Sequence, residues 1–203
     1  MIRVLQDDAE FNLLDARFSP DGLLVATAAI FQLGEVGQGR VKIWDWESGQ
    51  VVRTIDADAR YVDFDPSGTR IAMAGPEGPA EIWDVENGTR VAVLAGSPGG
   101  VTDVAYSPDG SRVATASNDG TVRLFEADTG AQQLILRGSG CAVQGVDFSP
   151  DGTRLASTSW CDGVRIWALD IDDLLEIARR EVKRELTDAE CRQYLHVDRC
   201  LQA

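Results

Sequence analysis

The sequence predicts an all-β fold with four blades' worth of four-stranded antiparallel sheets, where a blade is one such sheet. Three recurring patterns predict it. An aromatic tripeptide returns every 39 to 42 residues, and a turn with proline and glycine returns every 42 to 46. Another glycine follows the aromatic residue by 5 positions in the first three repeats. A period near 42 residues is typical of small sheets that stack radially, because none of them buries its own faces alone.

The aromatic tripeptides share a branched or leucine residue followed by Trp or Phe. They are Ile43-Trp44-Asp45, Ile82-Trp83-Asp84, Leu124-Phe125-Glu126 and Ile166-Trp167-Ala168. The turns share an aromatic residue, a proline and a closing glycine. They are Phe18-Ser19-Pro20-Asp21-Gly22, Phe64-Asp65-Pro66-Ser67-Gly68, Tyr106-Ser107-Pro108-Asp109-Gly110 and Phe148-Ser149-Pro150-Asp151-Gly152.

The third repeat shows how one blade is built. Residues 101–106 alternate apolar and polar, as in a half-buried strand, and the Ser-Pro-Asp-Gly turn follows, in which Pro presets φ and Gly takes the left-handed position. Residues 112–117 return as a second strand, and residues 121–125 form a third that carries Phe125. A fourth strand over 131–137 completes the blade. The corresponding fourth strands are expected at 50–55 and 89–94.

These patterns divide the chain into repeats at about 11–55, 57–95, 98–138 and 140–168, followed by a tail at 169–203. The last repeat lacks its fourth strand, because Asp172 stands where the glycine is due. Residues 1–6 read as a stray fourth strand. We expect Met1–Leu5 to complete the last sheet.

Residues 1–168 resemble a WD-repeat β-propeller. The resemblance implies that a Ser or Thr on the second strand and an Asp in the next turn join the Trp in a hydrogen-bonded cluster. Degenerate versions recur here, and Phe125 has no indole N–H to donate, so weaker hydrogen bonding is expected in the third repeat. The repeat residues are Trp44, Asp45, Trp83, Asp84, Thr115, Asp119, Phe125, Ser157 and Trp167.

Three arrangements are open, because such propellers usually close with six to eight blades. The chain is the C-terminal part of a longer protein, or two copies close a ring of eight blades, or four blades close a tight ring alone. An open end would expose strand edges and apolar faces.

The charge balance points away from several classes of partner. With 19 basic and 33 acidic residues the net charge is −14, which repels the phosphates of nucleic acids and of anionic membranes. No segment has the length and hydropathy of a membrane span, and the start lacks the pattern of a signal peptide. The four cysteines, at 141, 161, 191 and 200, are expected to be reduced thiols in a cytoplasmic protein.

The tail has a different composition. Residues 170–185 read as an amphipathic helix with acidic residues at its start and basic residues at its end, and a capping box at Thr187 opens a second short helix. The run Leu-Thr-Asp-Ala-Glu-Cys-Arg-Gln-Tyr-Leu-His at 186–196 resembles the tails of bacterial WD-repeat proteins, notably C-terminal propellers of large signalling ATPases, kinases and transcription regulators. We expect the helices to pack on the last blade or to bridge its incomplete edge, and the alternative is a helix that docks a partner.

The sequence predicts no enzyme, no catalytic residue and no cofactor. Cys191, His196 and Cys200 have metal-like spacing, but a closed zinc site needs four ligands, so no metal site is predicted. The glycines of the first repeat match no phosphate-binding motif.

The predicted function is a non-catalytic scaffold that binds a protein or peptide. The alternative is a regulatory segment of a larger bacterial signalling protein. The resemblance implies that partners dock on the side formed by the loops that join the second to the third strand and one blade to the next. The candidate contacts there are Ile30, Phe31 and Leu33 in the insertion at 29–40, Arg60 beside Tyr61, and Trp160.

Overall fold

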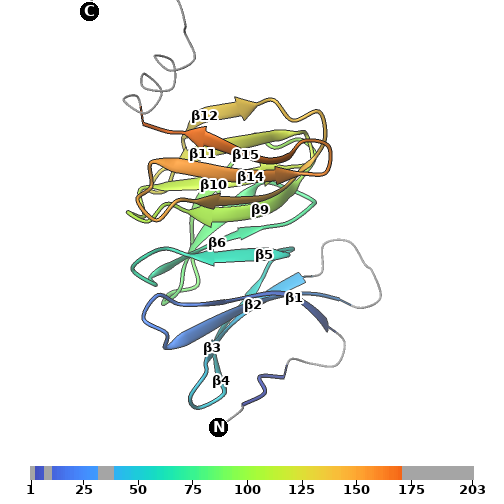
Figure 1. The fold of residues 1–203 in the computed structure, drawn as a ribbon. Helices are drawn as coiled ribbons and strands as arrows, with labels where there is room; N and C mark the ends of the chain where they lie inside the picture. The colour runs from blue at the N-terminus through green and yellow to red at the C-terminus, as the bar shows by residue number, and fades with distance from the viewer. Residues whose placement is uncertain (1–2, 7–10, 32–38, 171–203) are drawn as a thin grey trace, which may run out of the picture. The chain divides into compact units, whose positions relative to one another are not determined.

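The computed structural model describes residues 3–6, 11–31 and 39–170, and it confirms the all-β class (Figure 1). The chain divides into two units, Met1–Trp167 and Ala168–Ala203. The predicted tail helices, like Cys191, His196 and Cys200, lie outside the described residues.

The first two blades are complete antiparallel sheets of four strands, in sheet order the same as chain order. The first contains β1 (Phe11–Phe18), β2 (Leu24–Phe31), β3 (Gly39–Asp45) and β4 (Gln50–Asp56). The second contains β5 (Tyr61–Phe64), β6 (Arg70–Ala74), β7 (Ala80–Asp84) and β8 (Arg90–Leu94).

The third blade also has four strands, and the fourth has three among the described residues. The third contains β9 (Val101–Tyr106), β10 (Arg112–Ser117), β11 (Thr121–Glu126) and β12 (Gln132–Arg137). The fourth contains β13 (Val143–Phe148), β14 (Arg154–Ser159) and β15 (Gly163–Ala168). The four predicted strands of the third repeat are therefore confirmed to within a residue at each end.

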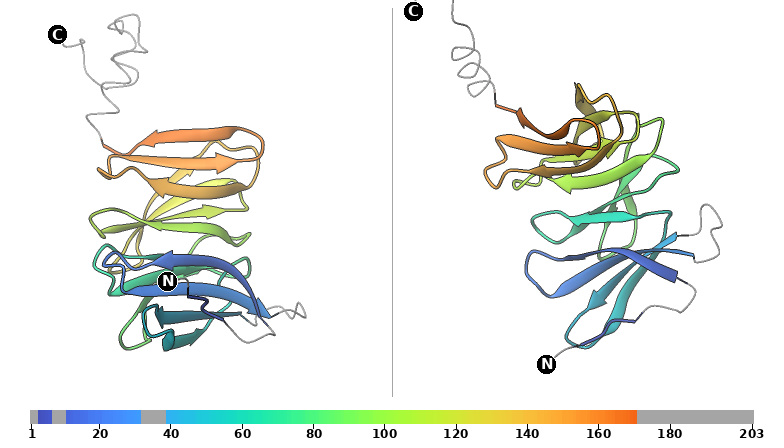
Figure 2. Two further views of the ribbon diagram at one scale, coloured as in Figure 1. Left: turned by 60° about the horizontal axis from the view of Figure 1, so that its bottom comes forward. Right: turned by 45° about the vertical axis from the view of Figure 1, so that its right-hand side comes forward.

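The blades stand in chain order and meet through their first strands (Figures 1 and 2). The strands β1, β5, β9 and β13, which we call the inner strands, follow one another, so that β5 contacts β1 and β9, and β9 contacts β13. Consecutive blades thus face each other across their flat sides.

The predicted turns take the expected geometry. In the third blade Gly110 has φ 72°, and its N–H donates to the carbonyl oxygen of Ser107 at 2.8 Å. The Asp109 carboxylate accepts from the Ser107 hydroxyl at 2.6 Å and from the Ser111 N–H at 3.0 Å. A left-handed residue is required at the end of this turn, which explains the glycine.

The hydrophobic core lies between blades rather than within one. One cluster joins the first two blades through Val41 and Ile43 on one side and Val62 and Ile71 on the other. A second cluster joins the second and third blades and includes Ile82, Leu94, Val104 and Phe125. Each blade therefore depends on its neighbours for burial, as stacked repeats do.

The structure overturns one expectation about the N-terminal residues and removes one of the three open arrangements. Residues 3–6 form no strand, and the Arg3 side chain lies against Gly49 in the first blade, so this segment does not complete the last sheet. The tight four-bladed ring is also excluded, because Phe18 of the first blade is 65% exposed and Ile166 of the last is 63% exposed. The four blades form an open arc. Among the residues described, no helix has the length and apolar character needed to cross a membrane.

Candidate functional site

Aspartates on the inner strands join consecutive blades. The Asp15 carboxylate accepts a hydrogen bond from the Val62 N–H at 3.2 Å, and the Asp103 carboxylate accepts from the Val146 N–H at 2.9 Å. At the junction of the second and third blades, Asp63 does the same for the Tyr106 N–H at 2.8 Å. The free edge of each of β5, β9 and β13 is thus bonded to a side chain of the preceding blade.

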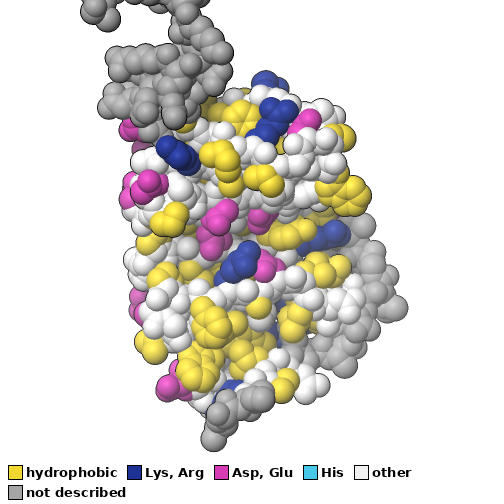
Figure 3. All heavy atoms as spheres, viewed as in Figure 1, with side chains coloured by type: hydrophobic (Ala, Val, Ile, Leu, Met, Phe, Trp, Pro, Cys, Tyr) yellow, Lys and Arg dark blue, Asp and Glu magenta, His cyan; other side chains and the backbone are white. Residues whose placement is uncertain are grey.

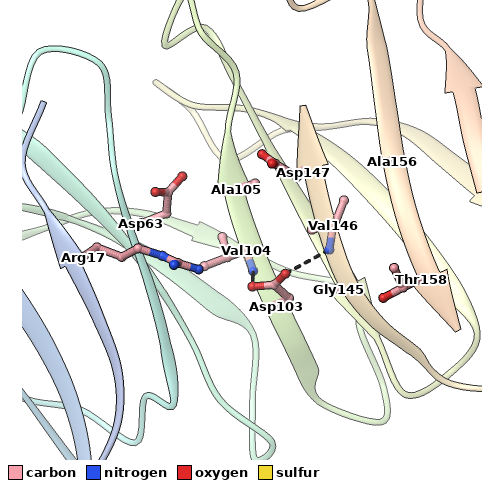
Figure 4. A pocket seen from close by; sticks show the side chains of 10 residues that line it. All are labelled: Arg17, Asp63, Asp103, Val104, Ala105, Gly145, Val146, Asp147, Ala156 and Thr158. Carbon is pink, nitrogen blue, oxygen red and sulfur yellow. Dashed lines mark hydrogen bonds between the residues drawn. The ribbon is translucent and has the colours of Figure 1, made fainter. Parts of the chain in front are cut away.

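Asp63 and Asp103 also border a cavity of about 380 Å³ beside the inner strands (Figure 4). Arg17 of β1 projects into it beside Asp63, while Asp103 and Asp147 come from β9 and β13. The remaining lining residues are small or apolar: Val104, Ala105, Gly145, Val146, Ala156 and Thr158. The cavity therefore carries three carboxylates and one guanidinium group.

Burial governs the electrostatics of the cavity. Desolvation raises the pKa of Asp63 from 3.8 to about 6, against the lowering effects of the Tyr106 N–H and of Arg17, while Asp147 and Asp103 raise it further. Desolvation also raises the pKa of Asp103, although the N–H groups of Val146 and Val104 oppose it. Such a site favours a cationic partner group, which relieves the cost of charged carboxylates.

None of the four charged residues of this cavity was predicted from the sequence as part of a site. A signal was available, because Asp15 and Asp103 stand five residues before the turn proline, while Asp63 and Asp147 stand three before it. The strand edges to which these carboxylates bond belong to the neighbouring blade, so the sequence of a single repeat does not reveal them.

The tryptophan-centred clusters are present in degenerate form. The Trp44 indole donates to the Thr27 hydroxyl at 2.9 Å, and the Trp167 indole donates to the Ser157 hydroxyl at 2.8 Å. In the second blade, the Trp83 indole donates instead to the Glu81 carboxylate at 2.9 Å, because Met73 stands in the second-strand position.

In the third blade, Phe125 is fully buried and the buried Thr115 hydroxyl has no hydrogen-bond partner in the described part of the chain. Asp119 bonds to Arg123 at 2.7 Å and to the Thr121 hydroxyl at 2.6 Å rather than to Thr115. The weaker hydrogen bonding predicted for this repeat is confirmed.

The aspartates that follow the tryptophans hold the next turn. Asp45 accepts from the Ser48 N–H at 2.8 Å, and Asp84 accepts from the Asn87 N–H at 2.7 Å. These contacts hold the turns that lead into β4 and β8. Their role is structural.

The second-to-third-strand loops and the loops between blades lie together on one side, which we call the loop face. It consists of residues 57–60, 75–79, 95–100, 118–120, 138–142 and 160–162. Asn118 donates to the Gly99 carbonyl at 2.8 Å, and the Gly140 N–H donates to Asp162 at 3.2 Å. Neighbouring loops on this side therefore bond to each other.

Trp160 is the most exposed large hydrophobic residue of the described chain, at 86%. Its neighbour Cys161 forms a disulfide with Cys141, whose Cα lies 5.9 Å from that of Cys161. The expectation of reduced thiols was therefore wrong for this pair. Cys161 occupies the turn position that Asp119 has in the third repeat, and the turn packs on the preceding interblade loop, which brings the two sulfur atoms together.

The other predicted contacts are more deeply packed. Phe31 stacks edge-to-face on Phe11 of its own blade, with ring centroids 5.5 Å apart, and the Arg40 guanidinium lies 3.5 Å from the centroid of the Phe11 ring. Ile30 precedes Phe31 at the end of β2 and is half-buried, and Leu33 lies outside the described residues. Phe31 therefore packs on its own blade.

Tyr61 is half-buried against the core between the second and third blades. The backbone N–H of Arg60 donates to the Ala74 carbonyl at 2.7 Å, and its side chain is half-buried. Of the predicted contacts that the structure describes, Trp160 alone is exposed.

Within the described ranges, no three His, Cys, Asp or Glu side chains are grouped so as to hold a metal ion. The cavity aspartates are spread over separate inner strands, and two of them bond to backbone N–H groups. Their geometry is that of interblade contacts and not of a metal cage.

Comparison with known proteins agrees with this geometry. The WD40 family model (WD domain, G-beta repeat) matches residues 88–126 and 130–168. Each match begins at the turn before the fourth strand of one blade and ends with the third strand of the next, so one repeat unit spans two blades.

Two curated proteins share this similarity. Transducin beta-like protein 3 of Bos taurus is 28% identical over 110 residues, and that of Homo sapiens is 27% identical over the same length. The match covers 52% of this chain but only 13% of each relative. Residues 88–126 and 130–168 are thus similar to WD40 repeats, and in the structure they contribute strands of three consecutive propeller-like blades.

Proposed function

We propose that this chain is a non-catalytic scaffold that binds a protein or peptide on its loop face, with Trp160 as the anchor. The observation that carries the proposal is the position of Trp160, which is 86% exposed although the disulfide Cys141–Cys161 fastens its turn. A large aromatic held on a constrained turn inserts into a partner at little cost in conformational entropy. By contrast Trp44 is 4% exposed and is part of the fold.

The charge of the cavity indicates the chemistry of the partner. Three carboxylates face one guanidinium there, and the whole chain has a net charge of −14. Thr158, which lines the cavity, lies two residues before Trp160. We therefore propose that the partner presents a Lys or Arg side chain near the group that receives Trp160. The same charge opposes binding to nucleic acid.

A displayed library of short peptides, half of them rich in Lys and Arg, tests this function. The immobilised chain is expected to enrich basic peptides that contain an apolar residue, and Trp160→Ala is expected to abolish that enrichment. Trp46→Ala is the matched control, because Trp46 is 38% exposed and lies in the turn at the opposite ends of the strands. Equal enrichment by the Trp160 and Trp46 variants contradicts the proposed anchor.

A second proposed function is a regulatory segment of a larger bacterial signalling ATPase, kinase or transcription regulator. It is supported by the resemblance of residues 186–196 to the tails of such proteins. The coding sequence upstream of Met1 provides the test, because this function requires a catalytic or DNA-binding module in the same reading frame. A stop codon directly upstream contradicts it.

We also propose a cytoplasmic location, and the redox state of the disulfide provides a test of it. Disulfides are rare in reducing compartments, so a cytoplasmic chain would hold Cys141 and Cys161 as thiols for much of its lifetime. Labelling with a thiol-reactive mass tag in intact cells tests this location. Tagging at both residues supports it, and complete protection contradicts it.

A further inference from the structure

The last blade exposes a face that the three other blades bury. On the third strand of each blade, two apolar side chains just before the aromatic point toward the next blade. Their exposed fractions are 0% for Val41, Ile43, Ala80 and Ile82, 1% for Val122 and 2% for Leu124. At the equivalent positions of β15, Val164 is 65% exposed and Ile166 is 63% exposed. We call this side of the last blade the trailing face.

The first blade exposes the complementary face. The aromatic residue that ends each inner strand is covered by the preceding blade, which leaves Phe64 5%, Tyr106 7% and Phe148 8% exposed. Phe18, which ends β1, is 65% exposed. Figure 3 shows hydrophobic side chains gathered over the first blade, and Leu23 there is 58% exposed. We call this side of the first blade the leading face.

The turns carry a second matching feature. At each junction the turn glycine packs on the turn proline of the preceding blade. A Cβ added at Gly68 would lie 3.6 Å from Pro20, one at Gly110 would lie 3.2 Å from Pro66, and one at Gly152 would lie 3.5 Å from Pro108. Nothing lies within 4 Å of the corresponding point at Gly22, and Pro150 of the last blade is exposed. Pro150, which is exposed, and Gly22, which has open space beside it, therefore lie at opposite ends of the arc.

A polar feature matches as well. Asp63 accepts a hydrogen bond from the Tyr106 N–H of the next blade. Asp147 has the same register in β13, three residues before the turn proline, and it is exposed. Phe18 has the register of Tyr106 in β1. The trailing face thus offers a carboxylate where the leading face offers a backbone N–H.

We propose that a second copy of this chain covers both faces, so that two arcs close one ring of eight blades. The leading face of each copy stacks on the trailing face of the other, in the register of the three junctions inside one chain. Phe18 covers Val164 and Ile166, Pro150 packs on Gly22, and Asp147 accepts from the Phe18 N–H. Inside one chain, the first three blades are each covered by the leading side of the next blade. A second copy fits because its leading face is equivalent to those sides. Two copies give eight blades, which is within the usual range for propellers, whereas three would exceed it.

Sedimentation equilibrium of the 203-residue chain measures the state directly. A dimer of twice 22.0 kDa is expected. Ile166→Glu and Phe18→Glu should each give a monomer. The two junctions of the ring are identical, so one substitution places a charge in both of them. The matched control is Leu134→Glu, since Leu134 is 43% exposed on β12 and belongs to neither face. Far-ultraviolet circular dichroism verifies that each variant remains folded.

Amide exchange at Phe18 supplies a readout that does not depend on a variant. Protection of its N–H that appears as the concentration rises supports the ring. A chain that stays at 22.0 kDa overturns the proposal. Blades other than those of a second copy would then have to cover the leading and trailing faces. Higher oligomers overturn the closed pair, and a dimer that survives both charged variants overturns this interface. None of these outcomes depends on Trp160, so failure of the ring is distinct from failure of the proposed function.

Discussion

The carboxylate of Asp63 in the second blade lies 2.8 Å from the backbone nitrogen of Tyr106 in the third and accepts its hydrogen bond. Asp15 and Asp103 make the same contact at the flanking junctions. An inner strand has no neighbouring strand on its free edge. A side chain from the preceding blade therefore satisfies a backbone donor that would otherwise be buried without a partner.

The first prediction concerns the pH dependence of stability. The pKa of Asp63 is about 6 in the folded chain against 3.8 in the unfolded chain, so the folded state binds more protons between these values. The free energy of unfolding should therefore fall as the pH rises from 4 to 6, by up to about 3 kcal/mol. Asp63→Asn keeps an acceptor for Tyr106 and should remove the part of the fall that comes from Asp63, while Asp103, whose pKa is also raised by burial, keeps its own part. Urea unfolding at several pH values measures it.

Asp147→Asn is the comparison for that measurement, because the exposed Asp147 carboxylate contributes to the raised pKa of Asp63. It should make the fall smaller without removing it. A profile that is equally steep in the Asp63 variant contradicts the assigned burial.

The second prediction compares two threonines in equivalent positions. Thr27→Val removes the acceptor of the Trp44 indole and should cost about 1 to 3 kcal/mol, because a buried donor loses its partner. Thr115→Val should be neutral or stabilising, since the Thr115 hydroxyl is buried without a partner. Chemical denaturation of both variants measures the difference. Equal losses would show that Thr115 has a partner after all.

The third prediction concerns the disulfide. Cys141 and Cys161 are 20 residues apart, and a cross-link of that span stabilises a fold by about 3 kcal/mol through the entropy of the unfolded chain. Reduction, or the double change Cys141→Ser and Cys161→Ser, should lower the thermal midpoint by several degrees. Calorimetry with and without reductant measures this, and the double variant should no longer respond to reductant.

The fourth prediction separates binding from folding at Trp160. Since this side chain is 86% exposed, Trp160→Ala should change the free energy of unfolding by less than about 0.5 kcal/mol. Trp167→Ala should cost several times more, because its indole bonds to Ser157. A large loss of stability in the Trp160 variant would make it a structural residue.

Much of the fold was predictable, because each repeat contains its own turn residues at fixed positions. The turn at Tyr106–Gly110 needs proline and glycine at fixed positions, and the strands on either side alternate in hydropathy, so their bounds follow locally. The sequence also predicts no fourth strand for the last blade, since no glycine follows Trp167 by five residues, but the place where that strand would begin lies outside the described residues. The unpaired Thr115 followed from the chemistry of Phe125.

The rest depended on contacts between blades, which no single repeat encodes. Asp63 and Asp103 stand at different offsets from their prolines, yet both bond to the next inner strand. Residues 3–6 resemble a strand but lie near Gly49 of the first blade. The disulfide joins residues half a period apart, and their proximity comes from the packing of the turn on the loop before it.

Amide hydrogen exchange at Val62, Tyr106 and Val146 tests the central claim most directly, namely that blades stack in this register through inner-strand aspartates. These three amide protons should exchange slowly, and Asp63→Ala should accelerate exchange at Tyr106 while leaving Val146 protected. Exchange at all three as fast as in the loops, or no change at Tyr106 in the variant, would contradict the account.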